Sequence, residues 1–237
     1  MRINAFLAAA GLGSRRSVES LVREGRVTVN GSLAHDLASR VDPEKDLVVC
    51  DGKPVRLSSF RYVLLNKPAG YACTRSDPHL KRTIYELLPE GTDLKYAGRL
   101  DVDSEGMVLL SNDGQWLNAI SHPRHEIAKT YEVEVEGAPS EEDLKKICAG
   151  IRSRDEVLRA KEVRFLEKHE ADSRLRLILM EGKNREIRRM FDGLNHPVRR
   201  LTRVAVGSLT LGDLKSGQWR ELNASEAALF QKPKQIP

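Results

Sequence analysis

The sequence predicts an α+β fold with a mixed, largely antiparallel central sheet and a small N-terminal unit of two helices and a few strands. Within the 237 residues, segments with a strand-like pattern outnumber helical ones. They do not alternate regularly with helices, as they would in a doubly wound parallel sheet. The character of the chain also changes near residue 62, where a polar stretch gives way to a buried strand. Two domains of unequal size are therefore expected.

Residues 1–57 are expected to form the small domain. Asn4 is placed to cap a short first helix, Ser14 to open a second, and Gly25 to end it. Alternating residues at 26–29 and 47–50 predict strands, and the Asn-Gly and Asp-Gly pairs that follow them predict tight turns. The apolar residues expected at helical spacing in these two helices are Phe6, Leu7, Ala10, Val18, Leu21 and Val22.

The polar stretch 54–61 is expected to connect the domains, with the linker proper at 58–61 and the large domain at 62–237. The strongest regular signal in the large domain is the strict alternation of AKTYEVEVEG (128–137), which puts Tyr131 and Val133 on one face. Asn184 is expected to cap a basic helix. Strands are predicted at 62–66, 106–111, 174–181 and 196–211, and helices at 115–120, 139–149, 184–194 and from residue 223.

The distribution of charge favours a polyanionic partner. The chain carries 39 Lys and Arg against 34 Asp and Glu, for a formal net charge of +5. The basic residues are concentrated in SRRSVESLVREGR and GKNREIRRMFDGLNHPVRRLTR, whereas the acidic residues lie mostly elsewhere. Such clustering is typical of a nucleic-acid-binding protein. Charge alone leaves solvated helix faces open as the alternative.

Composition also predicts the compartment. No segment approaches the ~20 apolar residues of a membrane span, and Arg15 and Arg16 stand where a signal peptide would have its cleavage site. The cysteines are scattered, which is typical of reduced thiols, and none has zinc-ligand spacing. A cytoplasmic protein without membrane association is expected. The three cysteines are Cys50, Cys73 and Cys148.

GRLDVDSEGM (98–107) raises the question of a metal site. Its spacing is that of the first half of a calcium loop. Position twelve, counted from Asp101, is Asn112 and not the required glutamate, and Arg99 disfavours a divalent cation. His122-x-x-His125 lacks a third ligand. No metal is therefore expected. The carboxylates of the loop are Asp101, Asp103 and Glu105.

Three interpretations of this loop stay open from spacing alone. An aspartate kept ionised by a nearby arginine is a competent nucleophile toward an electrophilic carbon. A glycosidase would use two carboxylates held at a defined distance, for which Asp103 and Glu105 are candidates. The same residues could simply shape a polar turn.

Four motifs, in order, resemble one family. GRLDVDSEGMVLLSNDG, with Asp101 inside Gly-Arg-Leu-Asp, resembles the signature of pseudouridine synthases of the RsuA type, which act on ribosomal RNA. LNKPAGY resembles the Lys-Pro-x-Gly motif of that family, AKTYEVEV its Lys-x-Tyr strand, and EGKNREIRRMF its C-terminal basic motif. SRRSVESLVREGRVTVNG resembles the small RNA-binding domain first known from ribosomal small-subunit protein four, the S4 domain. The resemblance extends to about Phe230.

The resemblance implies roles for individual residues. Asp101 matches the catalytic aspartate, Arg188 the basic residue that pairs with it, and Ile187 the apolar neighbour in the pocket. Tyr131 matches the tyrosine that stacks on the target uracil and is implicated in removing the proton from carbon 5. Further residues expected at the substrate are Arg99, Lys129, Arg185 and Arg189, and those expected to contact RNA from the small domain are Arg15, Arg16 and Arg23.

The implied function is isomerisation of a specific uridine to pseudouridine in ribosomal RNA, by base flipping and an aspartate-dependent rearrangement of the glycosidic bond. The segments 184–186 and 201–204 resemble members that act on large-subunit RNA more than those that act on small-subunit RNA. No cofactor is expected, and no dinucleotide fingerprint or P-loop is present in the sequence. The expected partner is ribosomal RNA or a pre-ribosomal particle, and the expected state is a monomer whose small domain shifts on its linker.

Two alternatives come from other classes. One is a non-catalytic RNA-binding factor in ribosome assembly, against which the intact GRLD, KTY and EIRR motifs argue. The other is a carboxylate-based glycosidase, which would need aromatic platforms for sugars. Aromatic residues make up only 5% of this chain, so the glycosidase is the weaker alternative.

Overall fold

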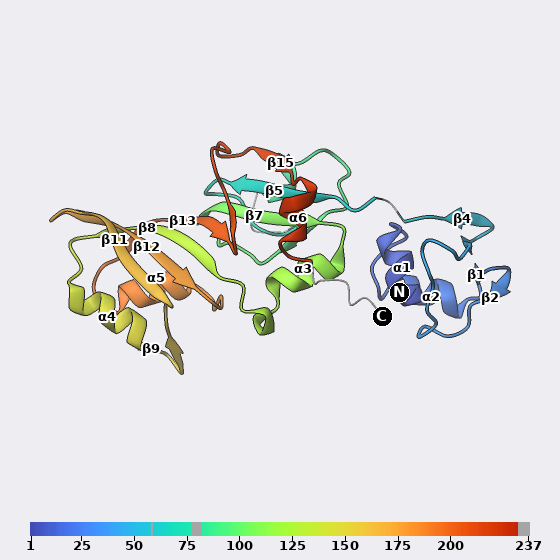
Figure 1. Ribbon diagram of the computed structural model, residues 1–237, viewed down its shortest axis with the longest axis horizontal. Coiled ribbons are helices and arrows are strands. Elements are labelled where there is room, and N and C mark those ends of the chain that lie inside the picture. The colour runs from blue at the N-terminus through green and yellow to red at the C-terminus, as the bar shows by residue number, and fades with distance from the viewer. Residues whose placement is uncertain (58, 77–81, 232–237) are drawn as a thin grey trace. The chain divides into compact units, whose positions relative to one another are not determined.

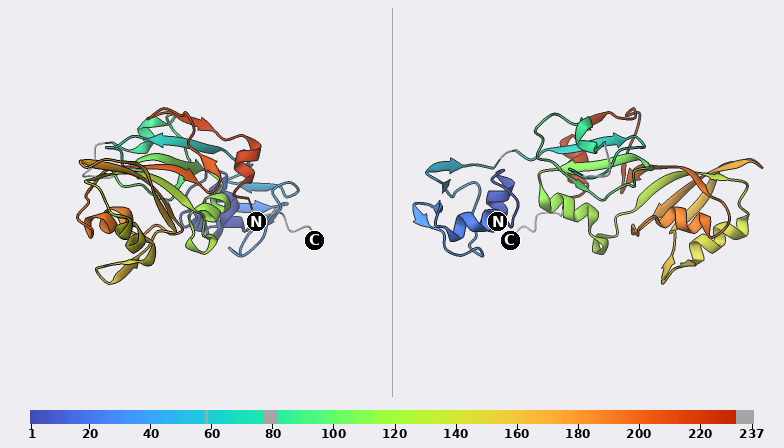
Figure 2. Two further views of the ribbon diagram at one scale, coloured as in Figure 1. Left: turned by 60° about the vertical axis from the view of Figure 1, so that its left-hand side comes forward. Right: turned by 180° about the vertical axis from the view of Figure 1, so that it is seen from behind.

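The structure is a computed structural model that describes residues 1–57, 59–76 and 82–231. The first residue of the expected linker, Ser58, thus lies outside the described residues. The chain divides into two compact units, Met1–Arg61 with Asn112–Gly114, and Tyr62–Ser111 with Gln115–Pro237. Figures 1 and 2 show the ribbon from different sides. The predicted α+β class with largely antiparallel sheets is confirmed.

The small unit packs two short helices on a four-stranded sheet of order β2-β1-β3-β4. Asn4 lies inside the first helix, so its prediction as the cap was wrong. The helix begins earlier because the backbone of Arg2 forms an isolated β-bridge with Arg40 and the amide of Ile3 donates to the carbonyl of Ser39 (2.9 Å). The elements are α1 (Ile3–Ala9), α2 (Val18–Arg23), β1 (Val27–Val29), β2 (Ser32–Leu33), β3 (Val48–Cys50) and β4 (Lys53–Val55).

The large unit is organised around one mixed sheet. Its main path is β11-β12-β8-β13-β7-β5-β15, with β14 paired to β13 and β6 to β7. Strands β7 and β13 run parallel, whereas the other pairs recorded in this sheet are antiparallel. The strands are β5 (Tyr62–Lys67), β6 (Lys95–Ala97), β7 (Glu105–Ser111), β8 (Lys129–Glu136), β11 (Glu162–Lys168), β12 (Asp172–Leu179), β13 (Val198–Val206), β14 (Leu209–Thr210) and β15 (Trp219–Glu221).

Two hydrophobic clusters lie on opposite faces of this sheet. Val63 and Leu65 of β5 belong to the cluster of α4 and α5, whereas Leu64 belongs to that of α3. Successive strand residues point to opposite faces, so α4 and α5 cover one side of the sheet and α3 covers the other. Helix α4 contacts β11 and α5 contacts β13, and Figure 1 shows both helices at the end of the sheet that contains β11 and β12. The helices are η1 (Ile84–Leu87), α3 (Gly114–Ser121), η2 (Pro123–His125), α4 (Glu141–Ala149), α5 (Glu186–Asp192) and α6 (Ala224–Ala228).

The helix starts in this unit test the capping predictions. Ser140 caps α4 by accepting from the amide of Asp143 (3.1 Å), which confirms the predicted start. Asn184 does not cap α5, so that prediction was wrong. The cap position is Arg185, in left-handed backbone geometry, and the carboxylate of Glu186 accepts from the amide of Lys183 (3.0 Å) to close the preceding turn. The hairpin of β9 (Ile151–Ser153) and β10 (Glu156–Leu158) was not predicted.

Candidate active site

One row of residues crosses four strands of the large sheet. Lys67 on β5 is in register with Gly106 on β7, Gly106 with Arg203 on β13, and Arg203 with Tyr131 on β8. Residues opposite each other in a sheet share a face. The row therefore puts two cationic side chains and a tyrosine on the face that α4 and α5 cover. A glycine is required at Gly106, where φ is +101° and a Cβ would lie 2.7 Å from the backbone nitrogen of Arg203.

Asp101 lies in the loop between β6 and β7. The amide of Ser104 donates to the carbonyl of Asp101 (3.1 Å) and closes a turn. The carbonyl of Val102 accepts from the amide of Gly70 (2.7 Å) and from Nζ of Lys67 (3.3 Å). The backbone of the loop is thus fixed at Asp101 and at the residue that follows it, while the Asp101 side chain keeps 36% exposure. This geometry presents a carboxylate to an incoming group.

Lys67 joins two motifs of the sequence. It is wholly buried, and its Nζ also donates to the carbonyls of Pro68 (3.0 Å) and Tyr71 (2.8 Å). Burial lowers the pKa of Lys67, and the acidic groups around it, Cys73 and the three carboxylates of the loop, oppose that change. Lys67 therefore ties the Lys-Pro-x-Gly turn to the Asp101 loop.

Two arginines from the C-terminal basic motif face this loop. Nη1 of Arg185 lies 3.7 Å from the carboxylate of Asp101 and 3.3 Å from that of Asp103. Arg188 was expected beside Asp101; the structure places its Nε 3.3 Å from the carboxylate of Asp103 and its Nη2 3.1 Å from the Asp103 carbonyl oxygen. Nη1 of Arg188 donates to Val198 (2.9 Å). The arginine side chain nearer to Asp101 is thus that of Arg185.

Two residues expected at the site, Tyr131 and Ile187, lie in one hydrophobic cluster. Tyr131 is 7% exposed and Ile187 is 3% exposed, and both belong to the cluster that includes Leu100, next to Asp101. Lys129 precedes Tyr131 by two residues on β8, so it shares the same face. Its Nζ donates to the carbonyl of Ile127 (3.1 Å). Burial lowers the pKa of Lys129, and the charge of Arg203 lowers it further.

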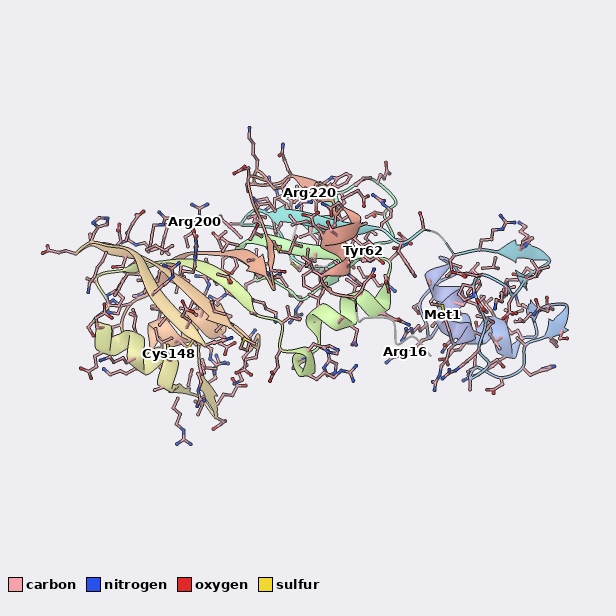
Figure 3. The ribbon with its side chains drawn as sticks, viewed as in Figure 1. Met1, Arg16, Tyr62, Cys148, Arg200 and Arg220 are labelled. Atoms are coloured by element: carbon pink, nitrogen blue, oxygen red, sulfur yellow. The ribbon has the colours of Figure 1, made fainter. Side chains whose placement is uncertain are left out.

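The remaining expected residues divide into exposed and internally bonded arginines. Arg99 is exposed, and within the described residues no carboxylate pairs with it, as is also true of Arg15 and Arg16. Arg23 is paired with Glu19 at 3.5 Å. Figure 3 labels Arg16.

Arg189 is engaged inside the protein. Its Nε and Nη2 donate to Ser153 (3.1 and 2.8 Å), and its Nη1 lies 2.9 Å from the carboxylate of Glu156. These bonds attach the β9–β10 hairpin to α5. The arrangement favours a packing role for Arg189 over the expected contact with substrate.

Two residues near this site, Arg203 and Glu186, have only weak signals in the sequence. Arg203 appeared only as part of a subgroup resemblance, because its place beside Tyr131 depends on strands far apart in the chain. Glu186 is 3% exposed, and burial raises its pKa while the amide of Lys183 opposes the rise. A glutamate inside a basic motif carries no pattern that predicts burial. Among residues 1–57, 59–76 and 82–231, no three His, Cys, Asp or Glu side chains gather as a metal site.

A partly exposed carboxylate on a fixed loop, beside arginines and next in sequence to a cluster that contains a buried tyrosine, is the arrangement of an enzyme that works through a carboxylate. Comparison with known proteins identifies its class. Residues 61–192 match the family described as RNA pseudouridylate synthase, and residues 1–48 match the S4 domain. The chain belongs to the RNA pseudouridylate synthase family. It is an isomerase that acts on RNA.

Relatives match over nearly the whole chain. An uncharacterized RNA pseudouridine synthase of Aquifex aeolicus is 39% identical, over 98% of this chain and 94% of that protein. The ribosomal large subunit pseudouridine synthase B of Bacillus subtilis is 35% identical, over 95% of this chain and 93% of that protein. A crystal structure of a pseudouridylate synthase aligns with a TM-score of 0.68 and 29% identity, over 96% of this chain and 98% of the other. In the described part of the chain, each helix is too short or too polar to cross a bilayer.

Proposed function

We propose that this protein converts one specific uridine of large-subunit ribosomal RNA to pseudouridine, with Asp101 as its catalytic carboxylate. The observation that carries the proposal is the partly exposed Asp101 side chain on a loop whose backbone is fixed by Lys67 and Gly70. The choice of RNA rests on relatives at 34–35% identity in Bacillus subtilis and Vibrio cholerae, both named ribosomal large subunit pseudouridine synthase B.

The reaction needs no external group. The bond from the ribose anomeric carbon to N1 of uracil breaks, a bond from the same carbon to carbon 5 forms, carbon 5 loses its proton and N1 gains one. The base must leave the helix stack to be reached. Asp101 then engages the nucleotide by attack at the anomeric carbon, by attack on the base, or by proton abstraction through a glycal. Each route requires an ionised and oriented carboxylate.

Neighbouring residues divide the remaining work. Tyr131 supplies a ring face for the uracil and a phenol near the departing proton. Arg185 stabilises the charge of Asp101 directly, and Arg188 acts through Asp103, which it contacts at both the carboxylate and the carbonyl. Ile187 closes the pocket on its apolar side. Arg99, exposed beside the loop, contacts the RNA backbone.

The small domain holds the RNA by its phosphates. Arg15, Arg16 and Arg23 of this domain provide salt-dependent affinity without reading the bases. The protein acts as a cytoplasmic monomer on ribosomal RNA or on an assembly intermediate. Light scattering after gel filtration tests the monomer, and a mass of twice 26.6 kDa would contradict it.

Pseudouridine mapping tests the proposed function. Purified protein is incubated with unmodified ribosomal RNA and with pre-ribosomal particles, then probed by carbodiimide adducts and primer extension. We expect one new stop, lost with Asp101→Asn, which keeps the shape of the side chain but lowers activity by about 1000-fold or more. Asp155→Asn, an exposed acid on the turn between β9 and β10, is the matched control and keeps full activity.

The absence of any stop on free RNA, particles or either subunit would refute the synthase proposal. It would favour the non-catalytic RNA-binding alternative, in which the GRLD loop only shapes a turn. A stop in small-subunit RNA alone would keep the activity and refute the proposed choice of substrate.

A further inference from the structure

Arg203 is a buried cation, and no acidic side chain of the described residues pairs with it. The residue is 3% exposed, and its Nε donates to the carbonyl of Met107 (2.8 Å). In the described chain its Nη1 and Nη2 have no acceptor and neither is fully enclosed, and no carboxylate pairs with the guanidinium. A buried arginine is normally paired, because an uncompensated charge in the interior is costly. Arg203 thus has two terminal nitrogens with donors to spare.

A second cation lies on the same face. Lys129 is two residues from Tyr131 on β8, and its charge is unfavourable beside that of Arg203, which lowers the pKa of Lys129 after the larger effect of burial. Nη1 of Arg203 also lies beside Gly98, 3.9 Å from where a Cβ would stand there. Gly98 begins the Gly-Arg-Leu-Asp segment. The unpaired end of Arg203 is therefore directed toward the loop that carries Asp101.

The burial of Arg203 limits which group of a bound nucleotide can contact it. The phosphates of an RNA lie on the outside of the RNA and would meet exposed arginines such as Arg99. A side chain with 3% exposure, in register with Tyr131, is reached only by a group that enters the protein. That group is the flipped base, whose carbonyl oxygens O2 and O4 are hydrogen-bond acceptors.

We propose that Arg203 is a substrate-contacting residue whose terminal nitrogens donate to a carbonyl oxygen of the flipped uracil. The inference rests on the proposed function and adds a group to its site. Breaking the bond between the anomeric carbon and N1 leaves the bonding pair on the base, spread over N1, O2 and O4. A donor that is already oriented and little hydrated stabilises this charge as it develops. The negative charge also compensates the buried cation Arg203 and the half-buried cation Lys129.

Arg203→Met tests the proposal, because a structural arginine and a base-contacting arginine respond differently. We expect release of tritium from RNA labelled at carbon 5 of uridine to fall by about 100-fold or more. We expect the melting temperature without RNA to stay the same or rise, since an unpaired buried charge is replaced by an apolar side chain. Arg203→Lys keeps the charge without the planar fork, so its rate of tritium release should lie between those of the wild type and Arg203→Met.

The control is Arg220→Met. Arg220, which is labelled in Figure 3, is paired with Glu226 of α6 at 2.6 Å. The substitution should lower the melting temperature and leave the rate unchanged below that temperature. If Arg203→Met instead lowered the melting temperature by as much as Arg220→Met, or kept its rate, Arg203 would be structural and the proposal would fail.

A modified substrate identifies the contact. RNA with 2-thiouridine or 4-thiouridine at the target replaces one carbonyl oxygen by a poor acceptor. We expect one replacement to slow the wild-type enzyme by about tenfold and to have little effect on Arg203→Met. Equal effects on both enzymes would overturn the contact. A wild-type protein that modifies no RNA would refute the proposed function instead, and the melting temperatures would still decide whether Arg203 is structural.

Discussion

Gly106→Ala should disrupt the sheet where its two halves join. Gly106 has φ of +101°, and a Cβ there would contact the carbonyl oxygen of Arg203 and lie 2.7 Å from its nitrogen. These are backbone atoms of the neighbouring strand, so no side-chain rotation relieves the overlap. Strands β7 and β13 are the parallel pair of the sheet, and their register is recorded at Thr202 with Glu105 and at Arg203 with Gly106.

The size of the effect follows from two contributions. A non-glycine residue in this backbone region costs about 1–3 kcal/mol. Separating β7 from β13 weakens two rungs of backbone pairing, at about 1 kcal/mol each. The sum is a loss of about 3–5 kcal/mol in the free energy of unfolding. At about 2–4 °C per kcal/mol for a domain of this size, the melting temperature should fall by about 6–20 °C.

Gly212→Ala is the matched control, because Gly212 also has a positive φ (+59°) but a Cβ there meets nothing within 4 Å. It isolates the backbone strain, about 1–2 kcal/mol. Urea unfolding of both variants, followed by circular dichroism, gives the two free energies. If they agreed within about 0.5 kcal/mol, close approach of the strands would contribute nothing and the reasoning would be refuted.

Two further predictions concern charge. Burial raises the pKa of Glu186 above its ordinary value of 4.5, so the folded state holds a proton that the unfolded state has lost, and stability falls as the pH rises above that value. The melting temperature of Glu186→Gln should therefore increase relative to that of the wild type as the pH rises above 4.5, and a constant difference would contradict this. Replacing Arg15 and Arg16 by alanine should reduce the slope of log affinity for RNA against log salt by about 1.5, with a smaller effect for Arg23, which pairs with Glu19. An unchanged slope would exclude phosphate contacts by these arginines.

Elements with local signals were predicted from the sequence. The alternation around Tyr131 predicted β8. The capping residues Ser140 and Asn223 predicted the starts of α4 and α6, where each side chain accepts a hydrogen bond from a backbone amide, at 3.1 and 2.9 Å. The missed strand β11 mixes charged and apolar residues (EVRFLEK), and it forms because β12 pairs along it. Such a strand is specified by its neighbour, which a local pattern does not contain.

The starts of α1 and α5 show a second limit. Asn4 and Asn184 are good capping residues, yet long-range contacts set the first start and the buried carboxylate of Glu186 sets the second. Propensity is a weak preference that tertiary contacts override.

The site shows the same division between local and long-range information. The loop of Asp101 could be found from the sequence because its carboxylates and flanking residues are contiguous, and the resemblance of four motifs then suggested its neighbours. Arg203 could not be placed, since its bond to Met107 joins residues 96 positions apart across a parallel pair. A sequence motif can identify a candidate residue, but the pairing of distant strands determines where that residue lies. The row Lys67–Gly106–Arg203–Tyr131 follows only from the sheet, and it is why an arginine outside the four motifs is proposed to contact the base.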